Sequence, residues 1–122
     1  MRYLNCEKLV LKKEMKDSDG KEVDPTLPAL LLNILEGYVP VEGLVLDTGQ
    51  LRTLNKAIDA LEEKDPEDGY YRLKDEEWKL AKQVCDKLLP MIRGASRNTP
   101  IIVDALESCP EELPKEDQLQ AA

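Results

Sequence analysis

Hydrophobic residues in this chain recur mostly at intervals of three and four, the spacing of helices that are apolar on one face. The first such segment begins after Thr26, which can cap a helix, and ends at Gly37 and Pro40. We predict that its buried stripe consists of Leu27, Leu30, Leu31, Ile34, Leu35 and Tyr38.

Two further segments have the same pattern. Asp47 or Thr48 caps the second predicted helix, whose stripe is Leu51, Leu54, Ala57, Ile58 and Leu61. The third begins at a predicted cap, Asp75, and is kinked or ended by Pro90. Its stripe repeats in steps of three and four through Trp78, Ala81, Cys85, Leu88 and Ile92. A short fourth helix is predicted from Thr99-Pro100 to Pro110.

The segment from Glu7 to Asp24 predicts a β-hairpin. Leu9–Leu11 has strand propensity, Asp17–Gly20 has turn chemistry, and Lys21–Val23 returns as a short strand. Two more short strands are predicted, over residues 44–46 and 70–73.

These elements predict a mainly α fold with a small N-terminal β-hairpin, in which three or four helices pack around one core. We expect a single domain over residues 4–108 and a flexible acidic tail over residues 109–122. The centre of the core is predicted to hold Leu31, Ile34, Leu54, Ile58, Trp78, Leu88 and Ile102.

Charge limits the classes of partner. With 25 acidic and 17 basic residues, the chain carries a net charge of -8. Such a field repels phosphate, so we expect no direct nucleic-acid binding, and a basic protein is the favoured partner. No stretch approaches the ~18 apolar residues that span a membrane. Three widely spaced cysteines do not form a disulfide framework and favour a reducing cytoplasm: Cys6, Cys85 and Cys109. Cys85 is expected in the core, and the other two near the surface.

Catalytic and cofactor chemistry has little support. The chain has no histidine, which removes the usual general base and the commonest transition-metal ligand. It also lacks the glycine-rich phosphate-binding motifs. Aligning Gly20 with the glycine of a calcium loop places Met15 and Thr26 at the positions where two oxygen ligands are needed. We therefore predict a non-enzymatic protein with no metal and no cofactor.

One segment is a candidate partner-binding site. An acidic loop leads into two tyrosines, and in a short strand one would point inward and the other outward, where it can anchor a partner. The candidate residues are Glu62, Glu63, Asp65, Glu67, Asp68, Tyr70 and Tyr71. A second feature is a basic island, in which Arg93, Arg97 and Asn98 could hold an anion or pair with carboxylates.

The order of these motifs resembles that of small proteins of unassigned function from tailed bacteriophages and prophages. The resemblance covers residues 4–108, from "LNCEKLVLKK" through "TLPALLLNIL" and "LRTLNKAIDAL" to "RNTPIIVDALES". It implies a viral origin and a rough architecture, and it assigns no functional residue. From the residues themselves we expect a protein-binding or assembly protein, which self-association would also suit. The alternative is an acidic mimic of nucleic acid that inhibits a host nucleic-acid-binding or defence protein.

Overall fold

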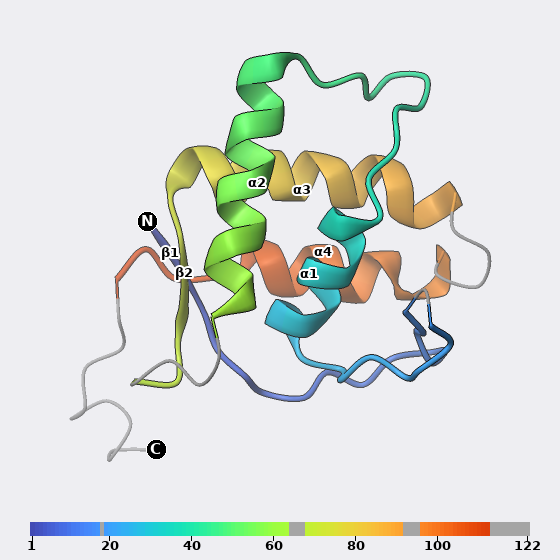
Figure 1. Cartoon of the computed structure of the whole chain (residues 1–122). Helices are drawn as coiled ribbons and strands as arrows, with labels where there is room; N and C mark the ends of the chain where they lie inside the picture. The colour runs from blue at the N-terminus through green and yellow to red at the C-terminus, as the bar shows by residue number, and fades with distance from the viewer. Residues whose placement is uncertain (18, 64–67, 92–95, 113–122) are drawn as a thin grey trace.

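Four α-helices and one pair of short strands form the regular structure of residues 1–17, 19–63, 68–91 and 96–112, which a computed structural model of the chain describes (Figure 1). Their order is β1 (Arg2–Leu4), α1 (Leu27–Glu36), α2 (Thr48–Glu62), β2 (Tyr71–Leu73), α3 (Asp75–Leu88) and α4 (Thr99–Glu107). Short 3-10 turns cover Leu89–Met91 and Ser96–Asn98. The predicted fold class, mainly α with a small antiparallel β element, is confirmed.

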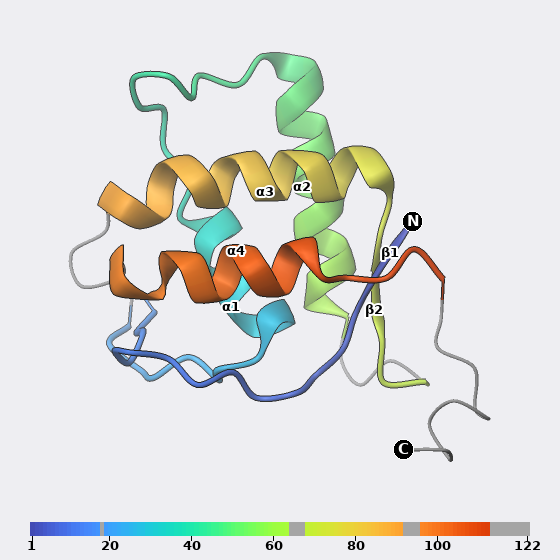
Figure 2. The same cartoon turned by 180° about the vertical axis from the view of Figure 1, so that it is seen from behind.

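Helix α3 is the centre of the packing, because it contacts α1, α2 and α4. In Figure 1, α1 and α2 lie in front of α3 and α4, and Figure 2 shows the reverse side. The apolar face of α3 is buried as predicted at Trp78, Ala81, Cys85 and Leu88, while Ile92 lies outside the described residues. Of the seven residues predicted at the centre of the core, six are buried and Ile58 is only half-buried.

The helix ends differ from the prediction in their capping groups. Asp47 caps α2 as predicted: its side chain accepts from the Gln50 amide at 2.8 Å, and the Gln50 side chain accepts from the Asp47 amide. The prediction for Thr26 was wrong, because its side chain makes no capping hydrogen bond to α1. Asp75 is not a cap either, since it lies inside α3, and the Lys74 amide donates to Glu77 instead.

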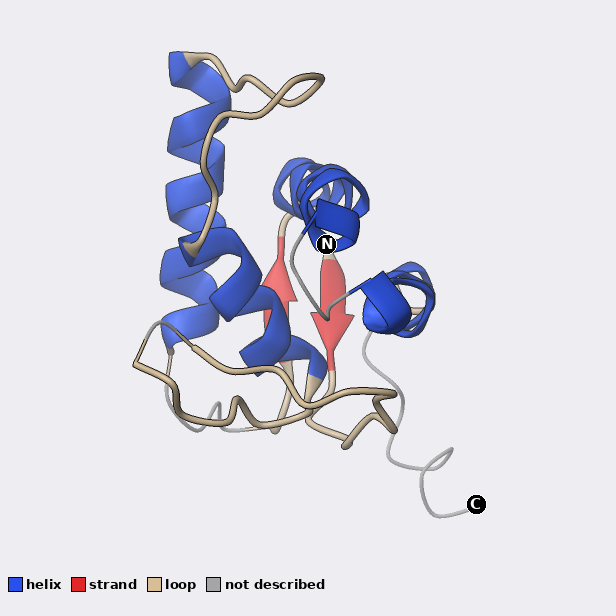
Figure 3. Ribbon diagram, turned by 90° about the vertical axis from the view of Figure 1, so that its right-hand side faces the viewer, coloured by secondary structure: helices blue, strands red, loops and turns tan. Residues whose placement is uncertain are grey.

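The two strands are far apart in sequence, because β1 lies near the N-terminus and β2 lies between α2 and α3. β1 pairs antiparallel with β2 in the register Arg2–Leu73, Tyr3–Arg72 and Leu4–Tyr71. Figure 3 shows the two strands beside the helices. On its other edge β1 is covered by the segment after α4, because the Tyr3 amide donates to the Pro110 carbonyl at 3.0 Å. The small sheet therefore joins three segments that are distant in sequence.

The hairpin predicted over Glu7–Asp24 forms only around its turn. Gly20 has a φ of +82°, and the Asp17 carboxylate accepts from the amides of Asp19 and Lys21. Beyond the turn, pairing is limited to a single bridge between Lys16 and Glu22. The strand predicted at residues 9–11 was wrong. This segment does not pair with Lys21–Val23, and the Leu9 amide donates to Pro25, just before α1. The strand predicted at 44–46 is likewise a loop.

The N-terminus is fixed by a cluster around Trp78. The Arg2 guanidinium lies 4.1 Å from the centre of the Trp78 ring, and one of its nitrogens donates to the Cys109 carbonyl. Arg2 also pairs with Glu111 at 3.0 Å, and the indole N–H donates to the Leu106 carbonyl. Packing thus continues to residue 111, three residues past the domain boundary predicted at 108, and residues 113–122 of the predicted tail lie outside the described ones.

Asn98 holds the long N-terminal segment against the helices. Its side chain is fully buried and makes no cap to α4. Instead, its Oδ1 accepts from the amides of Lys12 and Lys13 at 2.8 and 3.2 Å, and its Nδ2 donates to the Lys13 carbonyl at 2.7 Å. Residues 12 and 13 do not belong to a strand, so the Asn98 side chain supplies the hydrogen bonds that a neighbouring strand would otherwise make.

Candidate docking groove

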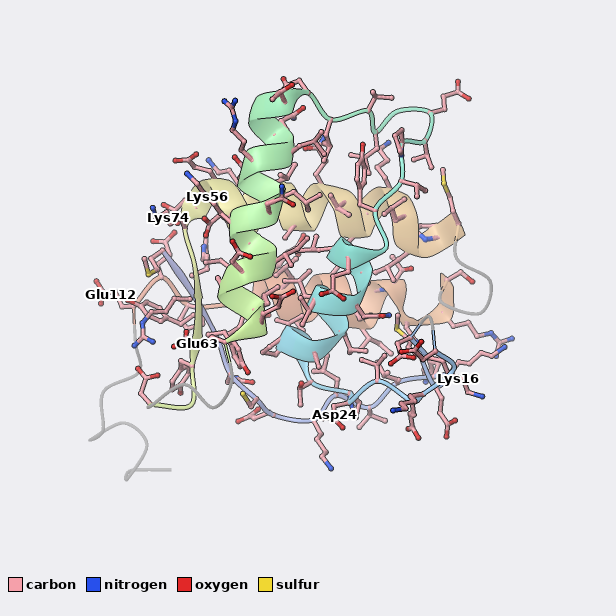
Figure 4. The ribbon with its side chains drawn as sticks, viewed as in Figure 1. Lys16, Asp24, Lys56, Glu63, Lys74 and Glu112 are labelled. Atoms are coloured by element: carbon pink, nitrogen blue, oxygen red, sulfur yellow. The ribbon has the colours of Figure 1, made fainter. Side chains whose placement is uncertain are left out.

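An open groove of about 610 Å3 lies between α1, the end of α2 and the start of β2. Its lining is largely apolar and includes Pro28, Ala29, Leu32, Leu61 and Tyr71. Three carboxylates also line it: Asp24, Glu62 and Glu63. Figure 4 labels Asp24 below α1 and Glu63 at the lower end of α2, on either side of this region. Cys6 and Thr26 complete the lining, and we call these ten residues the acidic groove.

The groove follows from how α1 and α2 pack. Leu30, Leu31, Ile34 and Leu35 face the core. Ala29 and Leu32, one helical turn apart, are only half-buried on another side of α1. The last turn of α2 places Leu61 against the core and leaves Glu62 and Glu63 exposed beside it. An apolar surface with a carboxylate edge results.

The carboxylates of the groove are not neutralised by close cations in the described part of the chain. None of the ion pairs found there involves Asp24, Glu62 or Glu63. Glu36, one turn beyond Leu32, hydrogen-bonds with Glu62. Partial burial raises the pKa of Glu36, and the hydrogen bond and repulsion from Glu62 raise it further. The groove therefore has a local excess of negative charge.

The structure brings together three of the seven predicted partner-binding residues, since Glu62, Glu63 and Tyr71 all line the groove. Asp68 does not belong to it. Its carboxylate pairs with Arg72, which is the main reason that its pKa is lowered, and it also accepts from the Tyr70 amide. Tyr70 and Tyr71 are both half-buried, so the in-and-out alternation expected of them is not seen.

The remaining predicted residues, Asp65 and Glu67, lie outside the described residues. The sequence reading missed the contribution of α1 to the groove. A signal was present, because Leu32 belongs to the run "LLL" but falls off the stripe that faces the core. Single apolar residues outside the core stripe are common on protein surfaces, so Leu32 alone could not locate the groove or its other residues.

The cysteines differ in environment. Cys6 is exposed and lines the groove, and its thiol donates to the Gly69 carbonyl at 3.6 Å. Burial raises the pKa of Cys85 to about 12 and that of Cys109 to about 11. Cys109, expected near the surface, is buried against Arg2 and α4, so that expectation was wrong. Both buried thiols stay protonated at neutral pH and are poor nucleophiles.

Two other features of the sequence concern metal binding and anion binding. In residues 1–17, 19–63, 68–91 and 96–112, no three histidine, cysteine, aspartate or glutamate side chains are grouped as metal ligands. The Asp17 carboxylate, considered as a calcium ligand, closes the turn described above. Of the basic island, Asn98 is used by the N-terminal segment, and Arg93 lies outside the described residues.

Comparisons with known proteins do not identify a family for this chain. No protein-family model matches the chain, and neither a curated protein nor a solved structure is significantly similar to it. Among the described helices, none is both long and apolar enough to pass through a bilayer.

Proposed function

We propose that this chain is a non-enzymatic protein-binding module, and that its acidic groove receives a partner segment in which lysine or arginine flanks apolar side chains. The observation that carries the proposal is the combination of an apolar lining with unneutralised carboxylates in one groove. Apolar side chains of the partner would gain free energy by leaving water. Its cations would face Asp24, Glu62 and Glu63, and this charge match would favour basic over acidic partners.

The size of the groove suits a short segment and a modest affinity. A volume of about 610 Å3 accommodates a few side chains. A contact limited to a few side chains is smaller than a standard interface, to which each partner contributes about 20–30 residues. We therefore expect dissociation constants in the micromolar range, as for transient assembly contacts, unless a second contact adds to the first.

The alternative function, mimicry of nucleic acid, has less support. It calls for carboxylates gathered on one face without cations among them. On the face in Figure 4, Lys56 and Lys74 lie near the side of the molecule that carries Glu63. The exposed face of α2 also mixes both signs, with Arg52 and Lys56 preceding Asp59. We retain protein binding, together with the proposed phage or prophage origin and cytoplasmic location.

Nuclear magnetic resonance titration with synthetic peptides tests the proposal. The probe is a twelve-residue peptide of alternating leucine and lysine, and the control peptide replaces each lysine with glutamate. We expect the basic peptide alone to shift the amides of Ala29, Leu32 and Leu61. The double charge reversal E62K/E63K should weaken binding about tenfold, which corresponds to about 1.4 kcal/mol.

The matched control is E42K, which reverses an equally exposed carboxylate in the α1–α2 loop, away from the groove. It should leave the affinity within about twofold of the unmodified chain. Shifts outside the groove, or equal weakening by E42K and E62K/E63K, would contradict the proposal, because general attraction to an acidic protein would then explain the binding.

A further inference from the structure

The chain itself carries a segment of the chemistry that the acidic groove suits. Residues 8–13, "KLVLKK", present Val10 with 88% of its surface exposed, the highest value among the large hydrophobic residues described. The flanking side chains of Lys8, Lys12 and Lys13 are also exposed. We call residues 8–13 the basic strip. The basic strip therefore combines an exposed aliphatic side chain with exposed lysines, which is the chemistry proposed for the occupant of the acidic groove.

The backbone of the basic strip is held in place, so Val10 is presented in a fixed position. The Leu9 amide donates to the Pro25 carbonyl at 2.6 Å, and Asn98 fixes the backbone of Lys12 and Lys13. Leu9 and Leu11 are half-buried against the core on either side of Val10. A segment that is already ordered loses little conformational entropy on binding.

The strip and the groove are neighbours on the same molecule. Lys8 forms a β-bridge with Thr26, which also lines the groove, and Pro25 lies between Thr26 and the rim carboxylate Asp24. Figures 1 and 4 show the N-terminal segment passing below α1, where Asp24 is labelled. A basic strip next to an acidic groove makes a surface that is complementary to a copy of itself.

We propose that two copies of this chain form a two-fold symmetric dimer in which the basic strip of each copy occupies the acidic groove of the other. Two-fold interfaces require such self-complementarity, because each residue pair occurs twice. The symmetry also doubles the buried surface and brings a small groove closer to the area of a stable interface. Val10 would enter the apolar lining, and Lys12 and Lys13 would face Glu62 and Glu63.

This inference rests on the proposed use of the groove and names its occupant. Each copy carries a charge of -8, so whole-molecule repulsion opposes the dimer. At about 0.15 M salt the screening length is about 8 Å, which weakens that repulsion more than it weakens contacts between adjacent charges. Association should therefore be measured at this ionic strength.

Sedimentation velocity over a concentration series from about 5 to 500 µM provides the test. We expect the unmodified chain to shift from monomer to dimer and V10D to raise the dimer dissociation constant at least tenfold. The matched control is V45D, because Val45 is 73% exposed in the α1–α2 loop. V45D should dimerise like the unmodified chain.

A charge exchange makes the test specific. K12E/K13E alone and E62K/E63K alone should each remain monomeric, since like charges then meet at both contacts of the dimer. An equimolar mixture should form a heterodimer, because the acidic strip of one variant faces the basic groove of the other and the second contact is unmodified. Failure of the mixture to associate, while the unmodified chain dimerises, would overturn the proposed interface.

The outcomes separate this inference from the proposed function. A chain that is monomeric at every concentration overturns the dimer, while the peptide titration still decides whether the groove binds a foreign basic segment. A dimer that V45D disrupts and V10D does not would place the interface elsewhere and would also overturn the inference.

Discussion

Replacing Asn98 with alanine should destabilise the protein mainly by releasing its N-terminal segment. The side chain makes three hydrogen bonds to the backbone of Lys12 and Lys13 and none to the helix that it precedes, so loss of a helix cap does not contribute. A buried backbone group left unpaired costs about 1–3 kcal/mol. Because Lys12 and Lys13 are partly accessible to water, we take the lower value for each group, which gives about 3 kcal/mol.

Such a loss is large against the 5–15 kcal/mol or so that stabilises a typical domain. With an unfolding entropy of about 2.1 cal/mol/K per residue, a chain of 122 residues should show a fall in Tm of about 12 °C. Urea unfolding would give the change in free energy, and hydrogen exchange would locate it. The amides of residues 12 and 13 should lose more protection in N98A than those of α3.

The matched control is N55A, which removes an exposed amide on the outer face of α2. It should change the free energy of unfolding by less than about 0.5 kcal/mol. A loss below about 1 kcal/mol in N98A, or exchange at residues 12 and 13 equal to that of the unmodified protein, would refute the argument that this side chain holds the segment.

Three other measurements test local chemistry. A thiol reagent at about pH 8 should modify one cysteine of the folded protein, Cys6, and three in denaturant, because burial raises the pKa of Cys85 and Cys109; rapid modification of all three would contradict this. Burial, and then Glu62, raise the pKa of Glu36, so the folded state holds the Glu36 proton more tightly than the unfolded state does. Ionisation of Glu36 therefore costs stability as the pH rises above the pKa of an unfolded glutamate. E36Q should therefore raise Tm at pH 7 and lose this advantage near pH 3.5, and an equal gain in E42Q would point to net charge instead. D47A removes the side-chain oxygen that accepts from the Gln50 amide and should cost about 1 kcal/mol in urea unfolding, with an unchanged midpoint counting against that cap.

The helices were predictable because burial of one helix face imposes its spacing on the sequence. The stripe of α3 was identified for that reason, and the end of α1 was identified from Gly37, a residue type that often ends helices. Cap identity was less certain, since Thr26 and Asp75 have suitable chemistry but their neighbours in space decide which group bonds. The strand predicted at residues 9–11 failed because its neighbours in space also decide its bonds: the Leu9 amide donates to the Pro25 carbonyl, and the buried amide of Asn98 holds residues 12 and 13.

The groove was predictable only in part. Glu62, Glu63 and Tyr71 were selected because an acidic loop led into an aromatic pair, and they do line it. Asp24 and Leu32 come from other parts of the chain, and nothing in their local sequence places them beside α2. Cys109 illustrates the same difficulty, because its burial depends on Arg2, more than a hundred residues earlier.

The placement of β1 bears on how the polypeptide is made. Its two flanking partners, residues 71–73 and Pro110, leave the ribosome long after β1 itself. The residues of β1 must therefore wait without their final neighbours while α1 and α2 emerge. Contacts so far apart in sequence are slow to close, so closure of the N-terminal strand should complete folding. An affinity tag fused directly before Met1 would interfere with that last step.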